Sequence, residues 1–326
     1  MAKRKKSTAK KKPRRKSRKN KLFKSSIVKA FGGLAILIVL VAVAGLLAHF
    51  LIPTEKPLKT DRPSKAVPQT QKPLAKIPPF EIYPPKDIPL EKPPIIKPPK
   101  DLKQLPLVAI IFDDMGYDKK IAKKLSQLNS GITFSILPHS PYQESIARLA
   151  HKNGLDIMLH LPMEPFEYPQ INPGPGTLLT TMTPDQLIHQ LEKNLAAVPY
   201  IKGVNNHMGS KMTAESGQMY QIFSILKKRN LYFIDSRTTS KTLCKPSARL
   251  FQIPFAQRDV FLDHFQDPDF IRKQIKELIR IAQRHGQAVG IGHPHTITYE
   301  ILREMMPELQ KKVKLVPASE IVHIVG

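Results

Sequence analysis

Acidic, imidazole and amide side chains recur in residues 107–326, each close to the end of a short apolar run. The run LVAIIFDD ends in Asp113 and Asp114, and the run LDIMLHLPME contains His160 and ends in Glu164. Similar positions after other apolar runs hold further residues of these types and one arginine. They are His139, Asn205, Asn206, His207, Asp235, Arg237, His293 and His295. Neutral imidazole and carboxylate are good ligands for zinc and similar divalent metal ions, and a catalytic site commonly uses three protein ligands. Side chains of these types could therefore bind a metal ion and transfer protons, if the fold brings them together.

The apolar runs predict short buried strands, and the segments between them predict amphipathic helices. The seven predicted strands lie in LVAIIFDD, ITFSILPHS, LDIMLHLPME, KGVNNHMGS, LYFIDSRTT, the FQIPF region and QAVGIGHPH. Apolar residues recur at steps of three and four in YDKKIAKKLSQL, PYQESIARLAHKN, TPDQLIHQLEKNLAAV, TAESGQMYQIFSILKKRN and DPDFIRKQIKELIRIAQRHG. Alternating strands and helices predict an α/β fold with a parallel sheet, either doubly wound or closed as a barrel. In both arrangements ligand sites form at the carboxyl ends of the strands, where the polar residues are predicted to lie.

Each of these polar residues also has a simpler interpretation when it is taken alone. An Asp after a strand often caps the next helix, and Asp118 is predicted to do only that. His139 follows Pro138 and fits a turn residue equally well. It is nevertheless difficult to explain by chance that acidic and imidazole side chains from five or six strands are all predicted to meet at one edge of the sheet.

The segments IIFDDMG, MLHLPMEP, NNHMGS, FIDSRTT and GIGHPH resemble the divergent polysaccharide deacetylases, the YibQ-like branch of the carbohydrate deacetylase superfamily. The resemblance covers residues 107–326 and implies a distorted (β/α)7 barrel. It also implies that Asp113 is a general base, that Asp114 is a metal ligand and that His293 is a general acid. Asp235 and Arg237 occupy the place where the superfamily has residues that orient the base and the acid. An arginine beside Asp113 would hold that carboxylate ionised.

The third metal ligand is the point where this chain departs from the superfamily. Strand three of the superfamily carries His-x-x-x-His, both metal ligands, which matches His160 but puts Glu164 at the second position. We therefore expect His207, after the fourth strand, to complete the site, with Glu164 as the alternative. The residues expected to bind substrate or to support the site are His295, His139, Asn206 and, where it is not a ligand, Glu164. The implied cofactor is a divalent metal ion, and zinc is the expected one.

Three segments of different composition precede the predicted domain. Residues 1–29 contain fifteen Lys and Arg and no Asp or Glu, residues 30–52 are apolar without a charged side chain, and residues 53–106 contain fifteen prolines. The apolar segment is long enough for one transmembrane helix, since about 20 residues cross a bilayer core. Positive charge on its amino-terminal side predicts a cytoplasmic tail and a single-pass protein of the inner membrane, with residues 107–326 periplasmic or extracellular. Residues 53–106 are predicted to be an extended linker. Secretion after cleavage near Ala42-Val43-Ala44 is the alternative.

The formal net charge of +26 would suggest nucleic-acid binding if it were spread along the chain. Residues 107–326, however, contain 26 Lys and Arg against 20 Asp and Glu. In the basic tail, aromatic residues do not alternate with the basic ones, as they do in many single-strand binders. We therefore predict no nucleic-acid partner and assign the basic tail to the anionic membrane surface. The expected function is a metal-dependent deacetylase that acts on an N-acetylated cell-envelope glycan. The alternative is a non-catalytic envelope protein that binds a glycan or acts as a scaffold on the same fold.

A reporter fused after Gly326 tests the predicted topology. We expect activity only from a reporter that works outside the cytoplasm, because a single apolar span with charge on its amino-terminal side carries the rest of the chain across the membrane. The measurement compares fusions to alkaline phosphatase and to a fluorescent protein that matures only in the cytoplasm. Fluorescence without phosphatase activity would contradict the predicted orientation.

Overall fold

The computed structural model describes residues 105–326. The predicted tail and membrane span, and all but the end of the predicted linker, lie outside the described residues. Within residues 105–326 no helix combines the length and the apolar character needed to cross a membrane. The described residues include the whole of the predicted α/β domain.

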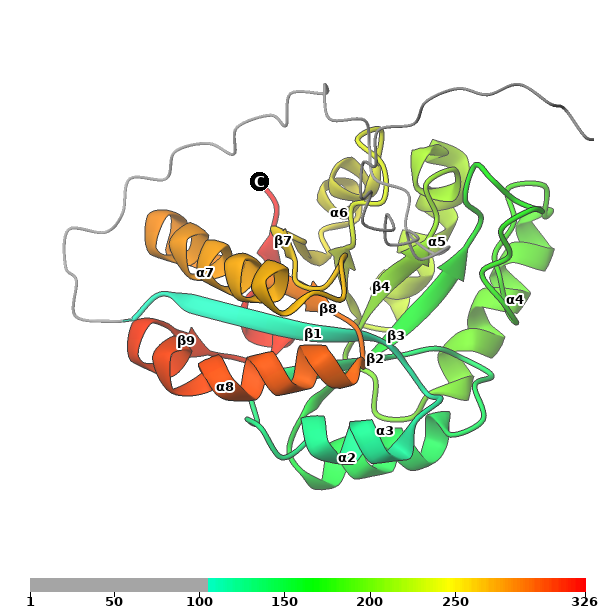
Figure 1. Cartoon of the computed structure of the whole chain (residues 1–326). Coiled ribbons are helices and arrows are strands. Elements are labelled where there is room, and N and C mark those ends of the chain that lie inside the picture. Colours follow the sequence, from blue (N-terminus) through cyan, green and yellow to red (C-terminus); the bar gives the residue numbers. More distant parts are fainter. Residues whose placement is uncertain (1–104) are drawn as a thin grey trace, which may run out of the picture. The chain divides into compact units, whose positions relative to one another are not determined.

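One sheet forms the centre of this domain (Figure 1). In chain order its strands are β1 (Leu107–Met115), β2 (Ile132–Ile136), β3 (Asp156–Met163), β4 (Gly203–Met208), β5 (Tyr232–Asp235), β6 (Pro254–Gln257), β7 (Val260–Phe261), β8 (Gln287–Gly292), β9 (Lys314–Leu315) and β10 (His323–Ile324). They lie in the order β10-β6-β5-β4-β3-β2-β1-β8-β7, and β9 pairs with β1. All of these pairings are parallel except that of β10 with β6. The predicted parallel α/β sheet is therefore confirmed.

The sheet is strongly curled, because β6 and β7 lie towards its opposite ends while only Arg258 and Asp259 separate them in the chain. The backbone N–H of Arg258 donates to the carbonyl of Asp235 in β5, and that of Asp259 donates to the carbonyl of Val289 in β8, both at 2.9 Å. Within residues 105–326 no pairing joins β6 to β7, so the sheet is a curled half-barrel without a closing ladder. The seven predicted strands omitted the two-residue strands β7, β9 and β10, which are too short to show a periodic pattern.

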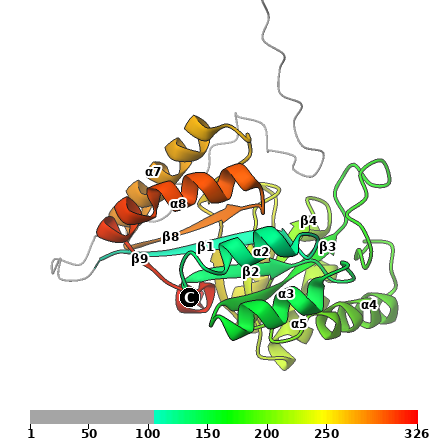
Figure 2. The same cartoon turned by 60° about the horizontal axis from the view of Figure 1, so that its bottom comes forward.

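Helices cover one face of the sheet (Figures 1 and 2). They are α2 (Lys119–Leu125), α3 (Gln143–Lys152), α4 (Pro184–Ala197), α5 (Ser216–Lys228), α6 (Cys244–Phe251), α7 (Pro268–His285) and α8 (Thr296–Lys312). The side chains of Asp118, Thr183 and Asp267 accept backbone N–H groups at the starts of α2, α4 and α7, which is the usual role of these residue types. The sequence analysis did not predict α6 and α8. Both contain a proline, Pro246 and Pro307, a residue that ordinarily ends a helix.

Side chains alternate between the two faces of each strand, and this divides the buried residues into two cores. The larger core contains outer-face residues such as Ile110, Phe112 and Phe134, together with the buried faces of the helices. The smaller core contains Ile111 and Val289 with other strand residues and includes no residue of α2 to α8, so it lies on the inner face of the curl.

Inner-face residues change from apolar to polar towards the carboxyl ends of the strands. Ile111, Met158 and Ile291 belong to the inner core. Two positions further along the chain from each come the polar residues Asp113, His160 and His293. On β4 the residues Asn205 and His207 take the corresponding inner positions, since Asn205 pairs with His160. The period of two along each strand therefore directs these polar side chains to one inner edge of the sheet.

Gly203 tests the packing of the inner face. It pairs with Tyr232, and a Cβ added at Gly203 would overlap the buried ring of Tyr232. We expect Gly203→Ala to lower the free energy of unfolding by about 1 to 3 kcal/mol, because the ring has to move in a packed core. Thermal unfolding is the measurement. Gly217→Ala in α5 is the matched control, since nothing lies within 4 Å of its added Cβ, and it should leave stability unchanged or slightly higher. Equal melting temperatures for Gly203→Ala and wild type would contradict the described packing.

Candidate functional site

A β-bulge in β1 turns two consecutive carboxylates towards the same space. From Phe112 to Met115, β1 advances by three residues where its partner β2 advances by two. The bulge contains Asp113 and Asp114, and Asp114 has a φ of 54° in the left-handed region. In a regular strand the two side chains would point to opposite faces. Here both approach His160 Nε2, which lies 3.7 Å from Asp113 Oδ2 and 3.2 Å from Asp114 Oδ1.

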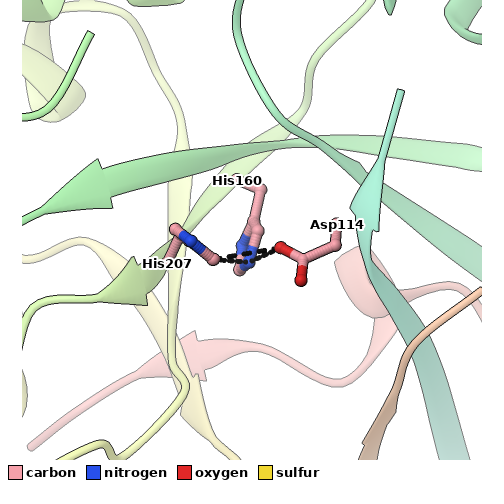
Figure 3. Close-up of side chains that lie close together, drawn as sticks. All are labelled: Asp114, His160 and His207. Carbon is pink, nitrogen blue, oxygen red and sulfur yellow. Dashed lines mark hydrogen bonds and ion pairs between the residues drawn. The ribbon is translucent and has the colours of Figure 1, made fainter. Parts of the chain in front are cut away.

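Three ligand-type atoms converge from β1, β3 and β4, and their side chains point towards one another (Figure 3). Asp114 Oδ1 lies 3.2 Å from His160 Nε2 and 3.0 Å from His207 Nδ1, and the two ring nitrogens are 3.1 Å apart. A tetrahedral zinc ion with bonds of about 2.0 to 2.1 Å separates its ligand atoms by about 3.3 Å. The triangle is therefore close to the size that such an ion requires.

The hydrogen bonds around this triangle leave lone pairs that face its centre. His160 Nδ1 lies 2.8 Å from Asn205 Oδ1, which only accepts, so a neutral ring carries its proton on Nδ1 and presents a lone pair at Nε2. Asp114 Oδ1 is buried and has no hydrogen-bond donor of suitable geometry. Electron-rich atoms at this distance repel one another unless a proton on one of the two ring nitrogens, or a metal ion, lies between them. One carboxylate and two imidazoles form a donor set that suits zinc and similar divalent ions.

Burial and neighbouring charges give the two carboxyl groups opposite pKa shifts. Burial raises the pKa of Asp113, and the imidazoles of His160 and His293 offset this only in part. Burial acts in the same direction on Asp114, but His207 and His160 outweigh it and hold its pKa well below the usual range. Asp114 therefore stays a carboxylate, as a ligand must, while Asp113 is a stronger base than an ordinary aspartate.

His293, directly after β8, is held by a buried carboxylate that the sequence analysis missed. Asp263 Oδ1 lies 3.0 Å from His293 Nδ1, while Oδ2 accepts the backbone N–H of His293 at 2.6 Å and the hydroxyl of Thr298 at 2.7 Å. This arrangement places a proton on Nδ1 and directs Nε2 towards the ligand cluster, 4.0 Å from Asp114 Oδ2. Burial would raise the pKa of Asp263, but the imidazole and these hydrogen bonds lower it. Asp263 follows the two-residue strand β7, so no visible strand pattern pointed to it.

Asp263, His293 and His295 form a second group of ligand-type residues. Asp263 already accepts three hydrogen bonds, and His295 Nε2 lies 3.2 Å from Gln266 Nε2. The ring of His295 is 5.8 Å from that of His293, centroid to centroid. These contacts indicate that Asp263 orients His293, and that His295 is a second imidazole beside it.

The sequence pattern that defines the family of divergent polysaccharide deacetylases matches residues 110–322, which contain every residue of this site. The chain belongs to this family. It is 35% identical over 216 residues to YibQ of Escherichia coli (strain K12), covering 66% of this chain and 67% of YibQ. It is 31% identical over 209 residues to a Haemophilus influenzae protein, covering 64% of this chain and 74% of that protein. A crystal structure of a protein from Agrobacterium tumefaciens C58 matches with a TM-score of 0.65 at 26% identity, covering 69% of this chain and 92% of that one.

In this member of the family, Glu164 binds neighbouring loops and lies outside the cluster of Asp114, His160 and His207. Its Oε2 accepts the backbone N–H of Thr180 at 2.5 Å and the Thr180 hydroxyl at 2.7 Å, and its Oε1 pairs with Lys211 Nζ at 2.7 Å. Burial would raise the pKa of Glu164, but Lys211 and Thr180 lower it. Of the two alternatives for the third ligand, the structure brings His207 to Asp114.

Asp235 and Arg237, expected from the superfamily to orient the base and the acid, make other contacts in this chain. Asp235 accepts the backbone N–H of Arg237 at 2.7 Å and the hydroxyl of Thr242 at 2.9 Å, and burial raises its pKa. A left-handed φ of 54° at Arg237 closes this turn. In the part of the chain that the structure describes, no hydrogen bond or ion pair joins the Arg237 guanidinium to Asp113. Asn205 Nδ2 donates to Asp113 Oδ1 at 2.8 Å instead.

His139 and Asn206 stabilise loops around the site. His139 is exposed, and its Nε2 lies 3.0 Å from Asn194 Oδ1 of α4. Asn206 is buried, accepts the backbone N–H of Ser236 at 2.9 Å and donates to the carbonyl of Met208 at 2.8 Å. Asn206 therefore joins the end of β4 to the segment after β5.

Single substitutions of the three clustered residues test the metal site. We expect Asp114→Ala, His160→Ala and His207→Ala each to reduce the metal content of the purified protein from about one ion per chain to almost none, because two ligands leave a poor site. Glu164→Ala is the comparison: it should keep the metal and lower thermal stability, since Thr180 and Lys211 lose their partner. Elemental analysis after dialysis is the measurement. Loss of metal in Glu164→Ala with retention in His207→Ala would reverse the assignment of the third ligand.

Proposed function

We propose that this chain is a metal-dependent deacetylase that hydrolyses N-acetyl groups of a cell-envelope polysaccharide. The observation that carries the proposal is the convergence of Asp114, His160 and His207, with Asp113 and His293 beside them. Membership in the divergent polysaccharide deacetylase family supports the same class of reaction. The donor set favours zinc as the ion.

A divalent metal ion supplies Lewis acidity when bound, since it polarises a carbonyl group and makes water a better nucleophile. Asp113 then acts as the general base that takes the proton of the attacking water. Burial raises the pKa of this carboxyl group, which strengthens it as a proton acceptor. Asn205 binds its Oδ1 at 2.8 Å, which leaves Oδ2 on the side of the ligand cluster.

His293 acts as the general acid that protonates the departing amine. Cleavage of the carbon–nitrogen bond needs a proton on the nitrogen as the bond breaks, and an imidazolium can give that proton from Nε2. Asp263, 3.0 Å from Nδ1, holds the ring in place and stabilises its protonated form. His295 is the neighbour that supports this residue or binds substrate.

The amino-terminal sequence supports a substrate in the cell envelope. The basic residues 1–29 and the apolar residues 30–52 fit a single anchor in the inner membrane, and the proline-rich residues 53–106 fit a tether. This arrangement would hold the domain outside the cytoplasm, where N-acetylated envelope glycans lie.

Acetate release from N-acetylated oligosaccharides, measured with wild type and variants, tests the proposal. His293→Ala, Asp113→Asn and Asp263→Asn should each retain the metal and slow turnover, by about 10²- to 10⁴-fold where acid or base catalysis is lost. Each removes a proton donor, a proton acceptor or the group that orients the donor, and none removes a clustered ligand. His295→Ala should have a smaller effect.

Two results would contradict these assignments. If His295→Ala is inactive while His293→Ala is nearly normal, the two imidazoles exchange roles. If wild type binds an envelope glycan but releases acetate from no N-acetylated candidate, a non-catalytic glycan-binding protein becomes the better description.

A further inference from the structure

Asn205 is a fully buried amide on β4, and all of its hydrogen-bonding positions are used. Its Oδ1 accepts from His160 Nδ1 at 2.8 Å and from the hydroxyl of Ser135 at 2.5 Å. Its Nδ2 donates to Asp113 Oδ1 at 2.8 Å and to Ser236 Oγ at 3.3 Å. One side chain therefore contacts both a member of the ligand cluster and the proposed base.

The curl of the sheet makes this double contact possible. Asn205 pairs with His160 on the adjacent strand β3, which explains the first contact. Asp113 lies on β1, which β2 and β3 separate from β4 in the sheet. Asn205 reaches Asp113 because the inner faces of β1 and β4 turn towards each other.

The chemistry of its neighbours fixes which way round this amide lies. A carboxylate only accepts hydrogen bonds, so the NH₂ end of Asn205 must face Asp113. The carbonyl end must then face His160 and Ser135. A carbonyl oxygen also only accepts, so a neutral His160 ring carries its proton on Nδ1 and directs the lone pair of Nε2 to the triangle.

We propose that Asn205 is a positioning residue that sets the tautomer of His160 and orients Asp113, so that one amide prepares both a metal ligand and the base. The inference rests on the proposed metal site. It assigns to a neutral amide the contact with Asp113 that the superfamily pattern led us to expect from Arg237. A hydrogen-bond partner of a ligating histidine fixes its ring orientation, and loss of such a partner typically weakens metal binding by about 10- to 100-fold.

The tautomer of His160 can be read directly from nitrogen-15 NMR of the metal-free, full-length protein. Two-bond correlations distinguish the two neutral tautomers at an alkaline pH where the ring is neutral, and His160→Gln identifies the signal. We expect the Nδ1–H form in wild type. Asn205→Asp retains an acceptor oxygen and should keep this form, whereas Asn205→Leu should shift the ring towards Nε2–H.

Asn206→Ala is the matched control, because it removes a buried amide from the same strand without touching His160 or Asp113. It should leave the tautomer unchanged. An Nε2–H ring in wild type, or an unchanged Nδ1–H ring in Asn205→Leu, would overturn the proposal. If Asn205→Leu does not fold, the wild-type spectrum still tests the proposal, because an Nε2–H ring there would overturn it.

Zinc affinity, measured by competition with a chelator, gives a second and independent result. We expect Asn205→Leu to bind zinc about 10- to 100-fold more weakly than wild type. Equal affinities would show that Asn205 does not prepare the ligand. If wild type binds no zinc, the proposed function fails, while the tautomer comparison still decides on Asn205.

Discussion

Two adjacent carboxylates can serve one site only where the alternation of a strand is interrupted, and the bulge in β1 provides that interruption. Asp113 then lies beside the cluster, where the proposed base is needed, and Asp114 lies within the cluster as a proposed metal ligand. The left-handed backbone of Asp114 costs about 1 to 3 kcal/mol, as do those of Met208 at the end of β4 and Arg237 just after β5. These three strained positions lie at the polar edge of the sheet, where the packed cores on both faces of the strands oppose their relaxation.

Most of the buried polar groups at this edge have their full set of partners. Asn205 uses four hydrogen bonds and Asp263 accepts three, so neither is left with a large desolvation penalty. Asp114 Oδ1 is different, because it is buried beside two ring nitrogens without a donor of suitable geometry. A cation would satisfy this oxygen and both nitrogens together. The close approach of Asp114 Oδ1 to the two ring nitrogens thus destabilises the metal-free site, and the same approach would favour metal binding.

Much of this edge could be predicted from the sequence, because polar residues close to the ends of apolar runs are expected to meet at the carboxyl ends of a parallel sheet. That rule pointed to Asp113, His160 and His207 among others. The period of two along a strand, had it been applied to β4, would also have separated Asn205 and His207 from Asn206. The strand-end rule could not find Asp263, since β7 has two residues and follows β6, which lies towards the opposite end of the sheet. The same rule could not show which groups the long side chain of Glu164 contacts. The ion pair of Glu164 depends on loops whose paths no local pattern determines.

The positions of Glu164 and His207 are connected through the register of β3 and β4. His160 pairs with Asn205 and Pro162 with His207, so His207 lies beside the strand segment between His160 and Glu164. From this position on β4, His207 directs its Nδ1 to Asp114 Oδ1, 3.0 Å away. Glu164 in turn binds Lys211, in the loop after His207, through both its carboxylate and its backbone carbonyl, at 2.7 and 3.2 Å. Glu164 thus holds the loop that follows His207.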